Sequence, residues 1–264
     1  MRRRFFVDGF EGRSAVLRGE AAHHLGRVLR AESGQLYELS DGESVWLART
    51  DSVGRDEVHF SLVESLPVHT QLVRITLLLA IVKFDRFEWA IEKATELGAD
   101  EIVPLAAERS EKGLLAAAVK RAARWERILT ESAQQARRLR VPVLRAAAKP
   151  KDAFRTVNAQ ARILLSERSG ACAMRDLLEP AAAGSRGHEA TTVAIAIGPE
   201  GGWTDTEFSA CKSCGFAEAA LGINILRTET AVCAALAAVQ YAFGAFRSKS
   251  ELESPQNEVR KEQV

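Results

Sequence analysis

Two glycine-containing segments late in the sequence have the residue types of ligand-binding loops. The first, Gly198-Pro-Glu-Gly-Gly202, follows an apolar β-type run over Val193–Ile197. Glycine tolerates positive φ, which we expect at Gly201 and Gly202, and it lets a backbone approach a flat ligand, while Pro199 stiffens the loop. An ordinary turn between a strand and a helix needs fewer glycines, so the composition favours a ligand loop.

The second segment is Leu221-Gly222-Ile-Asn-Ile-Leu226, and it is followed by Arg227-Thr-Glu229-Thr. It places an arginine and a glutamate directly after another glycine loop. After the first segment, Thr204 and Glu207 have the spacing of a capping box, which predicts a helix. The pair Cys211-Lys-Ser-Cys214 falls inside that helix. Because no second pair stands at zinc spacing, we interpret these cysteines as structural and expect no metal site.

Length and composition indicate a soluble globular protein. The chain has 264 residues, of which 47% are hydrophobic, so it can bury a core and has room for two domains. No apolar run approaches the length of a membrane span, and the basic start, Met1-Arg-Arg-Arg-Phe, has no signal-peptide pattern. We therefore expect a cytoplasmic protein, and its four cysteines fit reduced thiols.

A net charge of only +1 conceals a strongly basic stretch. Between Arg109 and Lys151 there are twelve Lys or Arg residues and three acids. A charged outer helix face is common on any protein, but such a face normally mixes both signs. With Arg27 and Arg30 nearer the N-terminus, the excess favours a polyanionic partner such as RNA.

The pattern of residues changes once along the chain. Residues 2–65 predict short strands and one helix around 21–29, with a hairpin at Asp41-Gly42, and together these indicate a small β-barrel. A linker precedes residue 72. Beyond it, strands near 73–81, 102–105, 143–146, 163–165, 193–197 and 217–221 alternate with helices near 84–97, 120–139, 151–157, 173–178, 204–214 and 228–246. Such alternation predicts a parallel sheet with helices on both faces, whose ligands bind at the carboxyl ends of the strands.

Several motifs, taken together and in order, resemble the RsmE family of 16S ribosomal RNA methyltransferases in the SPOUT superfamily. They include Arg4-Phe-Phe-Val7, His23-His-Leu-Gly-Arg-Val-Leu-Arg30, the helix segment Asp85–Gly98, Glu108-Arg-Ser110, Arg138-Leu-Arg-Val-Pro142, and both glycine loops with Leu226-Arg-Thr-Glu-Thr-Ala231. The resemblance implies transfer of a methyl group from S-adenosylmethionine to N3 of a specific uridine in the small-subunit RNA.

The resemblance also implies an architecture. It predicts a PUA-like RNA-binding β-barrel over residues 1–66, a SPOUT α/β domain over 72–247 with a C-terminal trefoil knot, and a flexible charged tail over 248–264. A homodimer is implied as well. The final helix, from Ala231 to Val239, is apolar on every face, so we expect it to be buried all round, either inside one chain or against a second copy.

The roles of individual residues follow from the implied reaction. Arg227 is the candidate for stabilising negative charge on the uracil carbonyl oxygens, and Glu229 is the candidate base for the N3 proton. An ion pair of Arg227 with Glu229 or Glu200 that only fixes the loop is the alternative. The predicted cofactor residues are Leu165, Ser166, Glu167, Gly198, Pro199, Glu200, Gly201, Gly202, Leu221, Gly222, Ile225, Leu226 and Thr230.

The RNA contacts are predicted at basic side chains in both parts of the chain. They are Arg4, Arg27, Arg30, Lys93, Arg109, Arg121, Arg124 and Arg138. Two other functions stay open beside the base methyltransferase. One is an RNA-binding or assembly factor with a decayed pocket, which the intact glycine loops disfavour. The other is a ribose 2′-O-methyltransferase on the same knotted fold.

Overall fold

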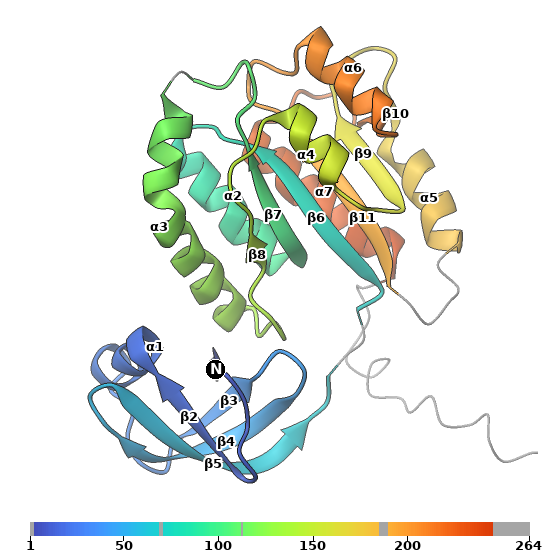
Figure 1. The fold of residues 1–264 in the computed structure, drawn as a ribbon. Coiled ribbons are helices and arrows are strands. Elements are labelled where there is room, and N and C mark those ends of the chain that lie inside the picture. The colour runs from blue at the N-terminus through green and yellow to red at the C-terminus, as the bar shows by residue number, and fades with distance from the viewer. Residues whose placement is uncertain (1–2, 69–70, 112, 185–189, 245–264) are drawn as a thin grey trace, which may run out of the picture.

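The computed structural model describes residues 3–68, 71–111, 113–184 and 190–244, and the predicted tail at 248–264 lies outside them. The described chain consists of a curled N-terminal sheet and a larger parallel sheet covered by helices on both faces (Figure 1). The expected mixed α/β class is therefore confirmed.

The N-terminal sheet has the strand order β1-β3-β4-β5-β2. Its strands are β1 (Arg4–Phe6), β2 (Ser14–Arg18), β3 (Leu36–Ser40), β4 (Val45–Val53) and β5 (Glu57–Leu66). Within the described residues the two edge strands, β1 and β2, do not pair with each other. The sheet is thus a curled half-barrel, where we expected a small β-barrel.

The open side of the half-barrel is filled by a short helical segment. Helix α1 (Gly19–His23) continues into a π-helical turn over His24–Val28. It buries Ala22 and Leu25 in the core that the curled sheet forms. The predicted hairpin between β3 and β4 is confirmed, although its loop has four residues, with the Asp41 carboxylate accepting the backbone N–H groups at 43 and 44.

The second sheet is parallel throughout, in the order β10-β12-β9-β11-β6-β7-β8. Its strands are β6 (Val73–Ala80), β7 (Ala99–Leu105), β8 (Val143–Leu144), β9 (Ala161–Leu165), β10 (Cys172–Ala173), β11 (Thr191–Ile197) and β12 (Ala217–Ala220). The helices are α2 (Phe84–Glu96), α3 (Leu114–Gln135), α4 (Pro150–Thr156), α5 (Met174–Gly184), α6 (Asp205–Ser213) and α7 (Thr228–Ala242). Only the short β10 was not predicted.

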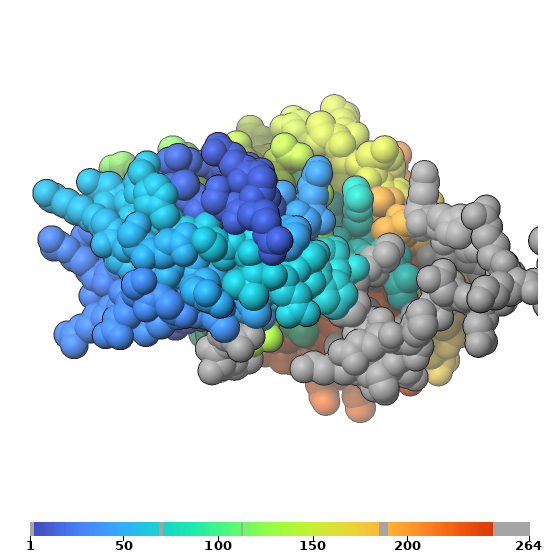
Figure 2. Space-filling model, turned by 90° about the horizontal axis from the view of Figure 1, so that it is seen from below, coloured from blue at the N-terminus to red at the C-terminus, as the bar shows by residue number. Residues whose placement is uncertain are grey.

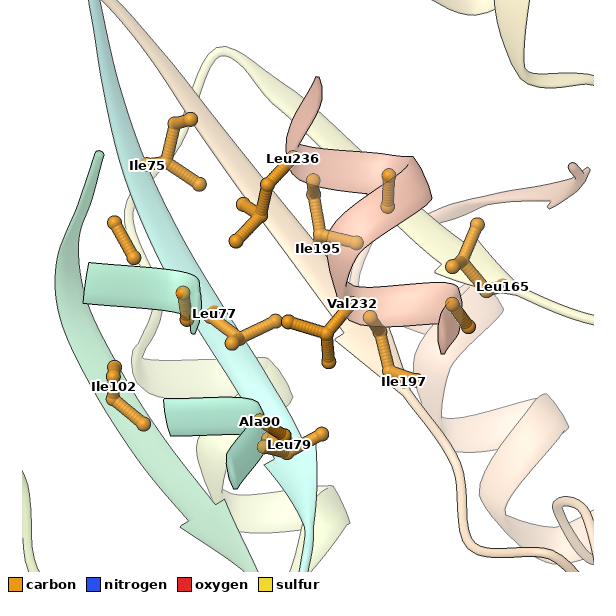
Figure 3. Close-up of a cluster of buried hydrophobic side chains, with 14 of the residues drawn as sticks. Ile75, Leu77, Leu79, Ala90, Ile102, Leu165, Ile195, Ile197, Val232 and Leu236 are labelled. Carbon is orange, nitrogen blue, oxygen red and sulfur yellow. The ribbon is translucent and has the colours of Figure 1, made fainter. Parts of the chain in front are cut away.

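Side chains of the central strands alternate between the two faces of this sheet. Ile75, Leu77 and Leu79 of β6 lie in the core beneath α2, α3, α5 and α7, while Leu78 lies in the core beneath α4 and α6. Figure 3 shows Val232 and Leu236 of α7 pointing into the first of these cores. A two-residue period is what a sheet buried on both faces requires.

Two helices differ from their predictions. Helix α3 begins at Leu114 and not near residue 120, because Gly113 at φ 90° introduces a helix-favouring Leu-Leu-Ala-Ala-Ala run, and it ends before Arg137 at φ 53°. Helix α7 ends at Ala242 and not near residue 246, and of the two kinds of burial that we left open for it, complete burial within one chain is not found. Its outer side leaves Ala234 and Ala237 partly exposed and Tyr241 77% exposed.

Polar contacts join the two parts at the amino ends of the parallel strands. Arg4 donates to Glu38 at 2.9 Å and to the carbonyl of Arg137 at 2.6 Å. Ser40 donates to the carbonyl of Leu139 at 2.8 Å, and Arg140 donates to the carbonyl of Gly42. Seen from this end, atoms of the N-terminal sheet form the near face of the molecule (Figure 2).

Candidate active site

The predicted cofactor residues gather at one end of the parallel sheet. They lie on the segments that follow β9, β11 and β12, which are neighbours in the sheet. This is the carboxyl end, opposite the end that contacts the N-terminal sheet (Figure 1). The topology therefore brings together residues that are far apart in the sequence, as expected for a ligand site in a parallel sheet.

The first glycine loop rests on a tryptophan. A Cβ atom at Gly198 would lie 3.0 Å from the ring of Trp203, so only glycine fits there without a shift. The indole N–H of Trp203 donates to the carbonyl of Leu165 at 3.0 Å, and Thr228 donates to the carbonyl of Gly198 at 3.1 Å. These contacts join the ends of β9 and β11 to the start of α7.

Gly201 and Gly202 of this loop are each required to be glycine for a different physical reason. Gly202 has φ 69°, as expected. The expected positive φ at Gly201 is wrong, because Gly201 is not among the residues with positive φ. A Cβ atom there would instead lie 3.1 Å from Cβ of Arg109, whose guanidinium donates to the Gly201 carbonyl at 3.0 Å. Close approach of the segment after β7 explains this glycine.

The predicted capping box is present at the start of α6. Glu207 accepts the backbone N–H of Thr204 at 2.8 Å, and the Thr204 hydroxyl accepts the backbone N–H of Glu207. The second carboxylate oxygen of Glu207 accepts the backbone N–H of Glu108 at 2.9 Å. The cap thus also ties the glycine loop to the segment that carries Arg109.

The second glycine loop exposes apolar side chains. Gly222 has φ 149°, Ile223 is 100% exposed and Ile225 is 78% exposed. Leu221 and Leu226, at its two ends, pack partly against the core. Two exposed isoleucines beside a glycine indicate a loop that is covered by something other than the described part of this chain.

The two candidate catalytic residues lie at the start of α7 and differ in exposure and in side-chain contacts. Arg227 is exposed, and its side chain has no hydrogen bond or ion pair with any residue that the structure describes. The Glu229 side chain is 15% exposed, and its Oε2 atom is buried with no hydrogen-bond partner among the described residues. The loop-fixing ion pair that we considered for Arg227 is therefore wrong.

Arg86 makes that ion pair instead. Its Nη1 atom donates to Glu200 Oε1 at 2.9 Å, and its Nε atom lies 3.9 Å from Glu229 Oε1. Arg86 lies in the first turn of α2, so it reaches both glycine loops from a third element.

The remaining predicted cofactor residues occupy the rim of the same region. Ser166 bonds through its backbone N–H to Ala219, and its hydroxyl accepts the N–H of Arg168. Pro199 is buried, whereas Glu167 and Thr230 are exposed.

The predicted RNA-binding residues do not form one cluster. Arg109 lies at the glycine loop. Arg27 is exposed on the helical segment of the N-terminal part, and Arg30 is exposed just after that segment. Arg121 and Arg124 of α3 both pair with the buried Glu88 of α2, at 2.7 and 2.9 Å.

Three more of these residues have partners within the chain. Arg4 belongs to the junction described above. Arg138 is buried, donates to Asp100 at 3.1 Å and has its pKa lowered by burial. Lys93 donates to Glu92 at 2.7 Å and to Glu96 at 2.8 Å, and these bonds raise its pKa. RNA contact stays a prediction for all eight side chains.

Sequence reasoning missed two residues that organise the site, Arg86 and Trp203. Trp203 follows the glycine loop directly, so its position was a usable signal. Arg86 stands in a segment that carries the family resemblance, but its partners lie far along the chain, so its contacts could not be predicted. No helix among the described residues is long and apolar enough to cross a membrane. In the same part of the chain, no three His, Cys, Asp or Glu side chains are grouped so that they could hold a metal ion.

Comparison with known proteins gives the same family for sequence and structure. A family model described as RNA methyltransferase domain matches residues 69–240. The ribosomal RNA small subunit methyltransferase E of Mycobacterium bovis is 32% identical, over 89% of this chain and 90% of the relative. The protein of that name from Synechocystis is 33% identical, over 82% of this chain and 69% of the relative.

Two solved structures are similar over nearly the whole chain. A crystal structure of a ribosomal RNA small subunit methyltransferase E from Neisseria gonorrhoeae, bound to S-adenosyl methionine, has a TM-score of 0.81 at 28% identity, covering 94% of this chain and 100% of that chain. A putative methyltransferase from Legionella pneumophila, in complex with the same cofactor, has a TM-score of 0.77 at 30% identity, covering 92% of this chain and 98% of that chain. The family that the sequence motifs indicated is thereby confirmed, and this chain belongs to the ribosomal RNA small subunit methyltransferase E family.

Proposed function

We propose that this protein transfers a methyl group from S-adenosylmethionine to N3 of a specific uridine in the 16S RNA of the small ribosomal subunit. Family membership supports the reaction class. The observation that carries the assignment to this site is the start of α7, beside the two glycine loops. There the side chain of Arg227 has no partner among the described residues, and Glu229 has a buried carboxylate oxygen with no hydrogen-bond donor among them. We place the protein in the cytoplasm because its proposed substrate is ribosomal RNA.

The loops fit the proposed cofactor. Gly202 and Gly222 have positive φ and no side chain, so they leave room for a flat base. The exposed Ile223 and Ile225 can pack against such a base. We propose that the thirteen cofactor residues predicted from the sequence line this slot. S-adenosylmethionine, when bound, supplies a methyl group that its sulfonium already activates.

Arg227 and Glu229 then divide the work on the uracil. N3 of uracil carries a proton at neutral pH, so methylation needs that proton removed and the resulting negative charge stabilised. We propose that Glu229 accepts the proton at its Oε2 atom, which has no hydrogen-bond partner among the described residues. Arg227 stabilises the charge that spreads onto the carbonyl oxygens, since its guanidinium is not committed to another described residue.

We further propose a knotted homodimer whose two parts meet between residues 66 and 72. In the sheet, β9 lies between β12 and β11, so the chain passes β9 on its way from β11 through α6 to β12, which is compatible with such a knot. A trefoil knot there, rare as knots are, clamps the ligand loops rigidly. A second copy covers the exposed side of α7, and the predicted basic side chains hold the RNA.

Methyl transfer to isolated small subunits and to naked 16S RNA tests the proposal. With isotopically labelled S-adenosylmethionine, nucleoside mass spectrometry of the digested RNA should show labelled 3-methyluridine. A ribose-methylated nucleoside would favour the 2′-O-methyltransferase. RNA binding with no label transferred to either substrate would favour the non-catalytic RNA-binding factor.

A further inference from the structure

The two ligand loops are linked by a single arginine that does not belong to either of them. Arg86 comes from the first turn of α2, Glu200 from the first glycine loop, and Glu229 from the first turn of α7. The arginine is 31% exposed, Glu200 is 44% exposed and Glu229 is 15% exposed. The network is therefore most shielded from water at Glu229, where the proposed base stands.

Exposed ion pairs usually contribute little to stability, so fold stability alone does not explain this arrangement. A planar guanidinium presents separate N–H groups in fixed directions, which suits it to hold two carboxylates at once, whereas lysine offers one compact charge. Here Nη1 takes Glu200 and Nε faces Glu229. The positions of the two loops are thereby coupled through one rigid group.

The contact also distinguishes the two oxygens of Glu229. Its Oε1 atom faces Arg86, and its Oε2 atom is buried with no partner among the described residues. A buried carboxylate oxygen without a donor is unfavourable, so a ligand that brings a donor gains by reaching it. The attraction between Arg86 and Oε1 at 3.9 Å favours the rotation of the carboxylate that leaves Oε2 as the oxygen for that donor.

From this geometry we propose that Arg86 is a positioning residue, which orients Glu229 toward the substrate and ties the cofactor loop to it through Glu200. The proposal rests on the proposed function, because it assumes that Glu229 accepts the N3 proton. Arg86 itself touches neither reacting group. Its contribution to the rate therefore passes through Glu229, and its contribution to cofactor affinity passes through Glu200.

A set of single and double variants tests each path separately. The variants are Arg86→Gln, Arg86→Lys, Glu200→Gln, Glu229→Gln and the doubles of Arg86→Gln with each glutamate variant. Arg18→Gln is the matched control, since it removes a surface arginine that pairs with Glu57 in the N-terminal sheet. The readouts are calorimetric affinity for S-adenosylmethionine, single-turnover methylation at saturating cofactor and RNA, and thermal unfolding.

Arg86→Gln should slow single turnover about ten- to a hundred-fold, the size of effect that a small misplacement of a reacting group produces. In the Glu229→Gln background the same change should slow it less than about twofold. Glu200→Gln should weaken cofactor binding, and Arg86→Gln should weaken it little further in the Glu200→Gln background. Arg86→Lys should fall between wild type and Arg86→Gln, and the control should match the wild type.

If the double variant of Arg86→Gln and Glu229→Gln is slowed by the product of the two single effects, the proposal is overturned. It is also overturned if Arg86→Gln lowers thermal stability but does not change the rate per folded molecule. If Arg86→Gln does not fold, Arg86→Lys and the exposed Glu200→Gln carry the same comparison. The binding arm keeps this inference separate from the proposed function. A wild type that binds cofactor but transfers no methyl group contradicts the function, while additive effects of Arg86→Gln and Glu200→Gln on affinity contradict the inference.

Discussion

At the scale of single residues, Arg227 and Glu229 are two positions apart on α7 but meet different surroundings. Glu229 has a cationic neighbour in Arg86, whereas Arg227 has no partner among the described residues. An unpaired arginine at the first residues of a helix gains nothing from the helix dipole, which favours anions there. We propose that it meets a negative charge that arrives with the substrate.

Arg227→Ala should therefore lower the single-turnover rate roughly a hundred- to a thousand-fold, the usual effect of removing one well-placed charge-stabilising donor. Binding of cofactor and RNA should change far less, because the charge develops mainly in the transition state. Arg227→Lys keeps the charge and loses the planar fork. A near-wild-type rate for Arg227→Ala at saturating cofactor would exclude the catalytic role and leave Glu229 as the main candidate.

The contact between Gly198 and Trp203 gives a second test at this scale. In Gly198→Ala the new methyl group would lie 3.0 Å from the indole ring, so the ring must move and weaken its hydrogen bond to Leu165. We expect a loss of about 1–3 kcal/mol in the free energy of unfolding, as for other overpacked sites, together with weaker cofactor binding. Gly9→Ala is the control, because its Cβ atom meets nothing within 4 Å.

At the scale of elements, the cap of α6 does more than start a helix. Thr204→Ala should cost about 1 kcal/mol, as cap substitutions do. Glu207→Ala should cost more, about 2–3 kcal/mol, since it leaves the backbone N–H groups of both Thr204 and Glu108 without acceptors. Urea unfolding measures both, with Ser209→Ala on the exposed side of α6 as the control. Equal losses for the two variants would contradict the link to Glu108.

Elements whose signal is local could be predicted from the sequence. The alternation in β6 and β11, the spacing of Thr204 and Glu207 and the glycines before Arg227 all act within a few residues, and the structure confirms the elements they indicate. The start of α3 was missed because its first turns carry Leu115 and Val119 facing outward, which breaks the amphipathic pattern.

Features that depend on distant partners could not be predicted. Arg86 reaches Glu200 across 114 positions of sequence, and Arg4 reaches the carbonyl of Arg137 across 133. The positive φ expected at Gly201 was wrong, because nothing near it in sequence reveals that Arg109 packs against it. A sequence shows which residues can do chemistry more readily than it shows which side chain holds them in place.

At the scale of the whole molecule, the junction and the ligand loops lie at opposite ends of the parallel sheet (Figure 1). Arg4→Ala should loosen the N-terminal sheet, costing about 2 kcal/mol in unfolding free energy, because Glu38 is 8% exposed and keeps only its 3.4 Å contact with Arg137. Cofactor affinity should be unchanged and RNA methylation reduced. If Arg4 contacts RNA only as a charge, Arg4→Lys should restore methylation without restoring stability.

The outer side of α7 leads to a prediction about the oligomeric state of the protein. Ala234 and Ala237 are partly exposed there and Tyr241 is 77% exposed, at spacings that place all three on one side of the helix. Small residues let a second helix approach closely, and a tyrosine contributes a large apolar surface. An apolar surface of this kind is more favourable when a second copy of the chain covers it than when it is exposed to water.

Ala237→Arg should therefore convert a dimer into a monomer in sedimentation-velocity runs at micromolar concentration, because each copy would bring a large charged side chain into the same contact. Val143→Arg, an equally charged change at the exposed edge strand β8, is the control and should stay dimeric. The exposed Ile223 and Ile225 lie just before α7, so a second copy on this helix would stand close to the cofactor loop. We therefore also expect Ala237→Arg to weaken cofactor binding. A wild-type monomer, or a dimer that survives Ala237→Arg, would show that α7 does not form the interface.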